Sequence, residues 1–189
     1  PPLIEPPRYT STYTPKQILV YLPFDDPAEY TNWLAKEKQH QFLVYCDVEQ
    51  ASDHDHIHIR PYSREQFQKD LSECSGVIAN AGFGLSSEAI QYGKKLLIKP
   101  LKGQMEQLSN AQALLELELG DVIHRYDQHI LKQWLDKPNP HSVRYPNVAA
   151  GIVQWIQSGR QQDISSLAKN LWQQTDLSDD RLATNISIA

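Results

Sequence analysis

The sequence is poor in features that would assign it to a specialised class of protein. Its 189 residues include only two cysteines, Cys46 and Cys74, and they lack a Cys-x-x-Cys spacing. A pair of this kind is typical of reduced, half-buried thiols and argues against a disulfide scaffold or a cysteine metal site. We therefore expect a cytoplasmic protein.

Long apolar runs and an excess of basic charge are also missing. No apolar stretch reaches the roughly 18 residues that a membrane-spanning helix needs. The formal net charge of −5 gives no electrostatic reason to bind nucleic acid or an anionic membrane. We expect neither a nucleic-acid partner nor a membrane span in this chain.

The length suits one domain of about 100–200 residues. The first stretch, PPLIEPPRYT, begins with proline rather than methionine and is typical of an extended interdomain linker. We predict a proline-rich linker over residues 1–15, a main domain over 16–160, and a C-terminal helix with a polar tail over 161–189. We also expect the chain to be a piece of a longer protein.

Buried strands and amphipathic helices alternate about five times along the main domain. Asp26 with Pro27 and a Ser-x-x-Gln capping box in SREQFQKDLSEC mark the starts of two helices. The predicted strands are Ile18 to Leu22, QFLVYC, HIHIR, Val77 to Ala79, KKLLIKP and a short one at Val122-Ile123. Their continuous apolar character and βαβ spacing predict an α/β fold, a Rossmann-like open parallel sheet flanked by helices on both faces.

Three later segments, HILKQWLDK, NVAAGIVQWIQSG and DISSLAKNLWQQ, have helical spacing of apolar residues. The simplest expectation is that these helices pack onto the sheet.

The stretch IANAGFGLSSEAIQYGKK contains the strongest functional signal. Its strand stops at Asn80, and Gly82 and Gly84 lie in a predicted loop before a helix over Ser87 to Tyr92 that ends at Gly93. Ligands of open parallel sheets bind outside the carboxyl ends of the strands. Backbone N–H groups at a helix N-terminus form an anion site there, with phosphate as the natural occupant.

Polar side chains around this loop extend the signal to a whole nucleotide. Ser86 and Ser87 offer hydroxyl groups, and the carboxylate of Glu88 can accept two hydrogen bonds from the vicinal hydroxyls of a ribose. A Gly-x-Gly turn before a helix is also common without a ligand, and an acidic residue in a first turn also complements the helix dipole. The next strand ends at Lys99-Pro100, and its loop adds Glu106 and Gln107 at the same edge of the sheet.

The order and spacing of these residues resemble the nucleotide-sugar-binding C-terminal domain of GT-B-type glycosyltransferases, as in families 1 and 28. The pattern of these enzymes runs His-Gly-Gly, a small polar pair, Glu-Ala, Gly-x-Pro, Pro, Asp-Gln, Asn-Ala. This chain reads Asn80-Ala81-Gly82, Ser86-Ser87, Glu88-Ala89, Gly93-Lys94-Lys95, Pro100, Glu106-Gln107 and Asn110-Ala111. It departs from the pattern at Asn80 and Glu106, and the first strand opens into Pro23-Phe24-Asp25 where many relatives have a Gly-Ser loop.

The resemblance implies a role for each position in binding a nucleoside diphosphate sugar. Glu88 would bind the ribose, the segment from Gly82 to Ser87 with Asn80 the diphosphate, and Glu106 with Gln107 the sugar hydroxyls. The backbone around Arg60-Pro61-Tyr62 would lie beside the base, for which uridine is usual in this pattern. No metal or other cofactor is implied, because a cationic side chain serves in its place, with Arg60, Lys99 and Lys102 as candidates.

For the whole protein, the resemblance implies a hexosyltransferase whose missing amino-terminal domain supplies the acceptor site and the catalytic base. We expect this chain alone to bind donor or free nucleotide weakly and to turn over nothing. The helix over Asn147 to Gly159 would cross back to the missing domain or finish the core of this one. Two alternatives stay open: a nucleoside diphosphate sugar 2-epimerase and a non-catalytic nucleotide-binding module.

One further pattern, SDHDHIHIR, alternates His54, His56 and His58 with acidic residues. Three imidazoles on one strand face suggest zinc. Because alternate side chains on a strand lie about 6–7 Å apart and the segment is polar, we favour an exposed, solvated stretch.

Overall fold

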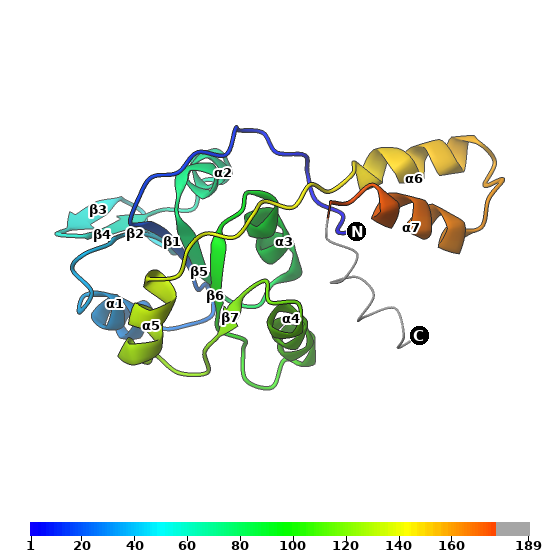
Figure 1. Cartoon of the computed structure of the whole chain (residues 1–189). Helices are drawn as coiled ribbons and strands as arrows, with labels where there is room; N and C mark the ends of the chain where they lie inside the picture. The colour runs from blue at the N-terminus through cyan, green and yellow to red at the C-terminus, as the bar shows by residue number, and fades with distance from the viewer. Residues whose placement is uncertain (177–189) are drawn as a thin grey trace.

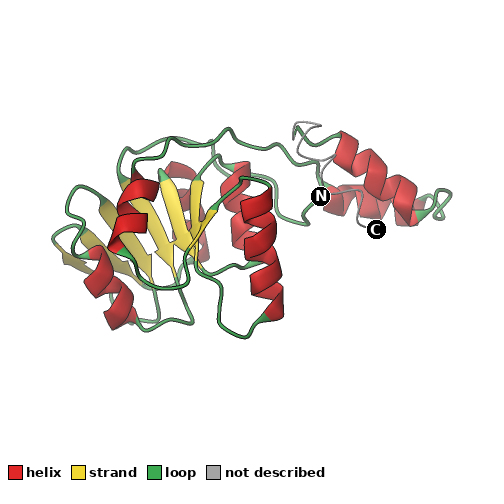
Figure 2. Ribbon diagram, turned by 60° about the horizontal axis from the view of Figure 1, so that its bottom comes forward, coloured by secondary structure: helices red, strands yellow, loops and turns green. Residues whose placement is uncertain are grey.

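In the computed structural model, which describes residues 1–176, seven strands form one sheet in the spatial order β3-β4-β2-β1-β5-β6-β7 (Figures 1 and 2). All neighbouring pairs are parallel except β3 and β4. The strands are β1 (Gln17–Tyr21), β2 (Gln41–Tyr45), β3 (Ser52–His54), β4 (Ile57–Arg60), β5 (Gly76–Ala79), β6 (Lys95–Ile98) and β7 (Asp121–Val122). The predicted Rossmann-like α/β fold is confirmed.

Helices cover both faces of this sheet, as Figure 2 shows. The helices are α1 (Pro27–Leu34), α2 (Arg64–Glu73), α3 (Phe83–Gln91), α4 (Met105–Glu116), α5 (Gln128–Leu135), α6 (Val148–Gln157) and α7 (Ile164–Gln173). Side chains of α1 and α5 form one apolar cluster with alternate strand residues such as Ile18 and Val20. Side chains of α2, α3 and α4 form a second cluster with Leu19, Val77 and Leu96. Since neighbouring residues of a strand point to opposite faces, continuous apolar strands supply both cores at once.

The predicted helix starts of α1 and α2 are confirmed. The Asp26 carboxylate accepts a hydrogen bond from the Ala28 N–H at 2.9 Å, and the Ser63 hydroxyl accepts one from the Gln66 N–H at 3.4 Å. Two strand-to-helix connections are therefore fixed by local capping, as the sequence indicates.

The predicted start of α3 at Ser87 is wrong by one turn. The helix begins at Phe83 with Gly82 as its N-cap residue, so Gly84, Ser86 and Ser87 lie inside the helix and not in a loop. The Ser87 hydroxyl donates to the Phe83 carbonyl at 2.9 Å, four residues earlier, so its hydroxyl is satisfied within the helix. The predicted end is confirmed, because Gly93 adopts a φ of 67°.

Helix α4 ends at Glu116, four residues before Gly120, so this glycine does not terminate it. Glu118 takes a left-handed φ of 54°, and the N–H groups of Glu118 and Leu119 donate to the carbonyls of Leu115 and Leu114 at 3.1 and 2.9 Å. This is a Schellman ending built on a residue other than glycine. Gly120 has a packing role instead, because a Cβ there would lie 3.2 Å from the Cβ of Leu96.

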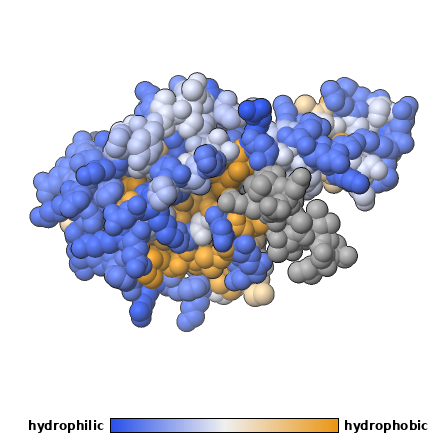
Figure 3. Space-filling model, in the orientation of Figure 1, coloured by the Kyte–Doolittle hydropathy of each residue, from blue (hydrophilic) through white to orange (hydrophobic). Residues whose placement is uncertain are grey.

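Helix α5 packs on the sheet as predicted, but α6 and α7 do not. Val148, Leu167 and Leu171 are buried in a small core of their own, against the partly buried Ile152 and Trp155. Figure 1 shows the two helices as a pair beside the α/β part, and Figure 3 shows a mostly hydrophilic surface over them. The predicted polar tail, from residue 177 on, lies outside the described residues.

The N-terminal segment contains no helix or strand before β1, and it lies against the α/β part. The N–H groups of Thr12 and Thr14 donate to the carbonyls of Ser72 and Glu73 at 2.9 and 2.8 Å. The buried ammonium of Lys94 donates to the carbonyls of Thr12 and Ser72 at 2.7 and 2.8 Å, and this burial lowers the pKa of Lys94. The segment therefore joins the α/β part through main-chain contacts.

Candidate functional site

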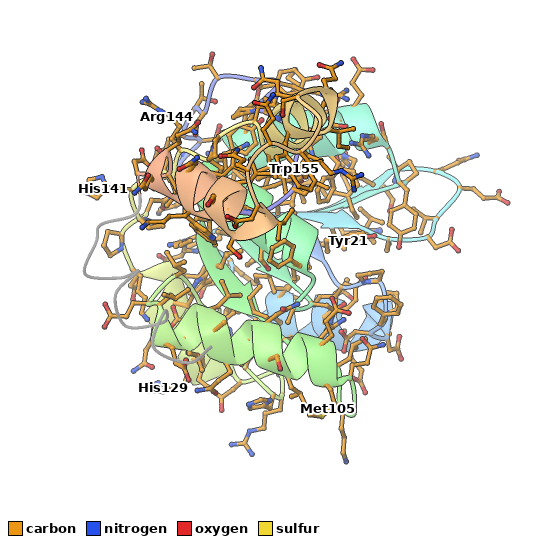
Figure 4. The ribbon with its side chains drawn as sticks, turned by 90° about the vertical axis from the view of Figure 1, so that its right-hand side faces the viewer. Tyr21, Met105, His129, His141, Arg144 and Trp155 are labelled. Carbon is orange, nitrogen blue, oxygen red and sulfur yellow. The ribbon has the colours of Figure 1, made fainter. Side chains whose placement is uncertain are left out.

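The parallel strands bring their carboxyl ends to one edge of the sheet. The register pairs Tyr21 with Ala79, Ala79 with Ile98, and Tyr45 with Arg60. Tyr21 at the end of β1 and Met105 at the start of α4 both lie on the right-hand side of the view in Figure 4. The residues that follow these strands are therefore neighbours, as the sequence predicts.

A cavity of about 300 Å³ lies at this edge, between the strand ends and helices α2 and α3. We call it the aromatic pocket, and it is lined by Tyr21, Tyr45, Tyr62, Ser63, Arg64, Phe67, Gln68, Leu85 and Glu88. Its rings meet edge to face, with centroids 5.9 Å apart for Tyr21–Tyr62, 5.5 Å for Tyr21–Phe67 and 4.9 Å for Tyr45–Phe67. Such packing gives a rigid apolar wall suited to a planar group.

Hydrogen bonds orient two polar groups of the aromatic pocket. Gln68 donates to one oxygen of the Glu88 carboxylate at 2.8 Å, so Glu88 is held from the α2 side. The Tyr45 hydroxyl donates to the buried Asp70 carboxylate at 2.6 Å. Burial, and then this contact with Asp70, raise the pKa of Tyr45. The pocket thus combines an oriented acceptor with an aromatic wall.

A second group of polar residues lies at the ends of β1, β5 and β6. We call it the charged cluster, and it consists of Asp25, Asn80, Lys99 and Tyr126. Asp25 and Lys99 form an ion pair whose side chains are only 10% and 16% exposed. The Asn80 amide donates to the Asp25 carboxylate at 2.9 Å and to the Lys99 carbonyl at 3.0 Å. The Lys99 ammonium also lies 5.0 Å from the centre of the Tyr126 ring.

Helix α3 begins shortly after Asn80, the member of the cluster that follows β5. Its N-cap residue, Gly82, provides no side-chain hydrogen bond, and the first turn contains no acidic residue. A Cβ at Gly82 or Gly84 would meet no atom within 4 Å. The space outside both glycines is therefore open, as an approaching ligand requires, and the positive end of the helix dipole faces it without an acidic residue of its own.

The remaining residues implied by the resemblance are placed less favourably. Arg60 is not among the residues that line the aromatic pocket; its guanidinium pairs with Asp53 of β3 at 2.7 Å. Glu106 is exposed in the first turn of α4, and the buried Gln107 accepts a hydrogen bond from the Leu101 N–H at 3.0 Å. The Ser86 hydroxyl is buried and has no partner among the described residues.

Sequence reasoning named Asn80, Lys99 and Tyr62 but missed the other rings of the aromatic pocket, the pairing of Asp25 with Lys99, and Tyr126. Tyr21, Tyr45 and Phe67 come from elements distant in sequence, and only their position at strand ends or on the inner side of α2 could have suggested a shared pocket. Tyr126 follows β7 in a short loop without a motif.

The three histidines of SDHDHIHIR form part of a β-hairpin. Residues 53–55, His54 among them, are exposed as we expected, but the residues that follow are buried or half-buried. His56 is buried, and its Nε2 lies 3.4 Å from the Leu34 carbonyl oxygen, while His58 contacts Asp53 at 2.8 Å and Gln41 at 2.6 Å. Among residues 1–176, no three histidine, cysteine or acidic side chains are grouped so that they could hold a metal ion.

Comparison with known proteins supplies a family match. A family model described as "Glycosyl transferase family 1" matches residues 1–138. No curated protein sequence matches significantly. Across residues 1–176, no helix combines the length and the apolar character that crossing a membrane requires.

Two solved structures share the fold. One is a glycotransferase of kitacinnamycin, with 12% identity and a TM-score of 0.51 over 65% of this chain and 36% of that one. The other is the spinosyn forosaminyltransferase SpnP, with 16% identity and a TM-score of 0.50 over 72% of this chain and 39% of that one. This chain therefore spans less than two-fifths of the length of either.

Proposed function

Because the chain belongs to glycosyl transferase family 1, we propose that it is the donor-binding domain of a glycosyltransferase. The donor is a nucleoside diphosphate sugar, and its nucleoside occupies the aromatic pocket. The observation that supports this most is that Glu88 and Tyr62, 26 residues apart in sequence, line the same cavity at the carboxyl edge of the sheet.

The chemistry of the aromatic pocket suits a nucleoside. A carboxylate that already accepts one hydrogen bond from Gln68 has acceptor capacity left for a vicinal diol. Tyr62 is 50% exposed, so its ring can cover one face of a base while Tyr21 supports its other edge. We take the base to be uracil.

The diphosphate then extends toward the N-terminus of α3. The open space at Gly82 and Gly84 allows close approach to backbone N–H groups, and Asn80 lies immediately before them. Glu106 and Gln107, at the start of α4, would lie beyond the diphosphate and accept hydrogen bonds from the hexose. Transfer itself requires an acceptor site and a catalytic base from a further domain, so this chain binds donor without turnover.

Isothermal titration calorimetry with the diphosphates of uridine, guanosine, thymidine, cytidine and adenosine tests this proposal. Loss of a charged hydrogen bond to ribose in Glu88→Ala should cost about 1.5–3 kcal/mol, or roughly ten- to a hundred-fold in affinity. Glu116→Ala is the matched control, because Glu116 is an exposed carboxylate on α4 that accepts a hydrogen bond from the Gln112 amide.

We expect one diphosphate to bind selectively, Glu88→Ala to weaken it and Glu116→Ala to leave it unchanged. Equal binding of that diphosphate by the wild type and Glu88→Ala would reject the ribose role of Glu88. A full-length protein that binds a nucleotide sugar and yet neither transfers nor hydrolyses it would point to a non-catalytic module.

A further inference from the structure

The Asp25 carboxylate takes up hydrogen-bond donors that an external anion would need. One of its oxygens contacts the Lys99 ammonium, and the other accepts from the Asn80 amide at 2.9 Å. Both donors lie at the carboxyl edge of the sheet: Asn80 follows β5 and lies two residues before Gly82, the N-cap residue of α3, and Lys99 follows the neighbouring strand β6.

This arrangement leaves part of Asn80 unsatisfied. Both side-chain N–H groups of Asn80 are used, for Asp25 and for the Lys99 carbonyl, while its side-chain oxygen is buried and has no partner among the described residues. Rotating the amide by 180° would place that oxygen against the Asp25 carboxylate. The negative charge of Asp25 therefore fixes an orientation in which one buried acceptor lacks a hydrogen bond, which is costly inside a protein.

The position of Asp25 in the chain allows its side chain to rotate away from Lys99 and Asn80. It lies in the β1–α1 connection, between Pro23 and the capping residue Asp26, and its neighbour Phe24 is 68% exposed. Its N–H donates to the Leu22 carbonyl at 3.1 Å, so the main chain is anchored in a turn and only the side chain needs to rotate. Rotation would free Lys99 and Asn80 without moving β1 or α1.

We propose that Asp25 is an internal substitute for a phosphate group, which holds Lys99 and Asn80 until the diphosphate of the ligand displaces it. This inference rests on the proposed donor-binding function for the identity of the ligand. We call Lys99 and Asn80 the anion site, and the ligand that this site itself recognises is a phosphate or diphosphate anion. Donor binding is then weakened by the need to displace Asp25, and Lys99 gains a phosphate partner only in the complex.

Calorimetric titration with inorganic pyrophosphate tests the anion site without involving the nucleoside. Asp25→Asn removes the competing charge and keeps the side-chain shape, and we expect it to bind pyrophosphate about tenfold more tightly than the wild type does. The double variant Asp25→Asn with Lys99→Met should lose that gain. Thermal unfolding followed by circular dichroism checks that each variant is folded.

Three results would overturn the proposal: pyrophosphate binding by Asp25→Asn no tighter than by the wild type, no binding by either protein at about 10 mM, or a gain that survives Lys99→Met. If Asp25→Asn does not fold, nuclear magnetic resonance of the wild type decides. The side-chain amide signals of Asn80, assigned with Asn80→Ser, should shift at high pyrophosphate, and unchanged signals would equally overturn it.

The two proposals fail separately. Suppose that Glu88→Ala binds nucleotides as tightly as the wild type and that Asp25→Asn binds pyrophosphate more tightly. This result rejects the nucleoside site in the aromatic pocket and supports the anion site. The reverse pattern rejects the role of Asp25 alone.

Discussion

The aromatic pocket and the charged cluster lie at the same edge of one sheet, yet they are built on opposite principles. The aromatic pocket is an open cavity with a half-exposed ring at Tyr62 and an oriented carboxylate at Glu88. In the charged cluster, Asp25 and Lys99 neutralise each other with side chains that are 10% and 16% exposed.

The difference shows which part of the edge is ready for a ligand. A preformed pocket binds without first breaking contacts of its own. A group of paired charges binds an ion only when the new contacts replace the old ones, since each charge in a poorly solvated place needs a partner. We therefore expect that a variant which leaves one charge of the Asp25–Lys99 pair without its partner loses stability, whereas replacement of Glu88 in the aromatic pocket lowers binding.

The largest expected effect tests this contrast at Lys99. Lys99→Met leaves the Asp25 carboxylate poorly solvated without its cation and should lower the free energy of unfolding by about 3 kcal/mol. Urea denaturation measures the change. The double variant with Asp25→Asn should recover most of the loss, because no unpaired charge is left; a double variant as unstable as Lys99→Met would show that packing and not charge is responsible.

The sheet and its two helical layers follow from the sequence because their signals are local. Continuous apolar runs predicted β1, β2 and β5, and capping residues placed the starts of α1 and α2. The start of α3 was misplaced because Gly84, Ser86 and Ser87 are poor helix formers by local propensity.

The candidate site likewise contains residues that a local sequence pattern predicts and contacts that no local pattern predicts. Glu88 could be found from a motif, because the residues of that motif lie within one strand-turn-helix unit. The aromatic wall and the pairing of Asp25 with Lys99 depend on contacts across as many as 74 residues of sequence, and no local pattern encodes them. Arg60 was assigned to the site from the family resemblance, and the antiparallel strand β3 supplies Asp53 as a partner for its guanidinium.

Two tyrosines allow a matched and smaller test, one in each region. The Tyr45 hydroxyl donates to Asp70, so Tyr45→Phe removes a hydrogen bond to a buried carboxylate and should cost about 2 kcal/mol. The Tyr126 hydroxyl is buried and has no hydrogen-bond partner among the described residues, while its ring contacts Trp33 and Lys99. Tyr126→Phe keeps the ring contacts and should leave stability unchanged or slightly higher. Equal losses in both variants, measured by urea denaturation at neutral pH, would show that the hydrogen bond to Asp70 is not the cause of the loss in Tyr45→Phe.

Alkaline pH gives the smallest and most specific effect. Burial raises the pKa of Tyr45 and of Tyr126, and the neighbouring carboxylates Asp70 and Asp25 raise them further. The folded state then keeps two protons that the unfolded chain loses above its tyrosine pKa of about 10, so each tyrosine lowers stability as the pH rises past that value.

Each tyrosine contributes at most about 1.4 kcal/mol per pH unit to this loss. Lys94 and Lys95 act in the opposite direction, because burial lowers their pKa values and the unfolded state binds more protons in that range. Comparison of the wild type with Tyr45→Phe and with Tyr126→Phe between about pH 9 and pH 11 cancels the lysine contribution. We expect both variants to lose stability less steeply than the wild type, and parallel curves for all three proteins would show that neither hydroxyl is protected from ionisation by the fold.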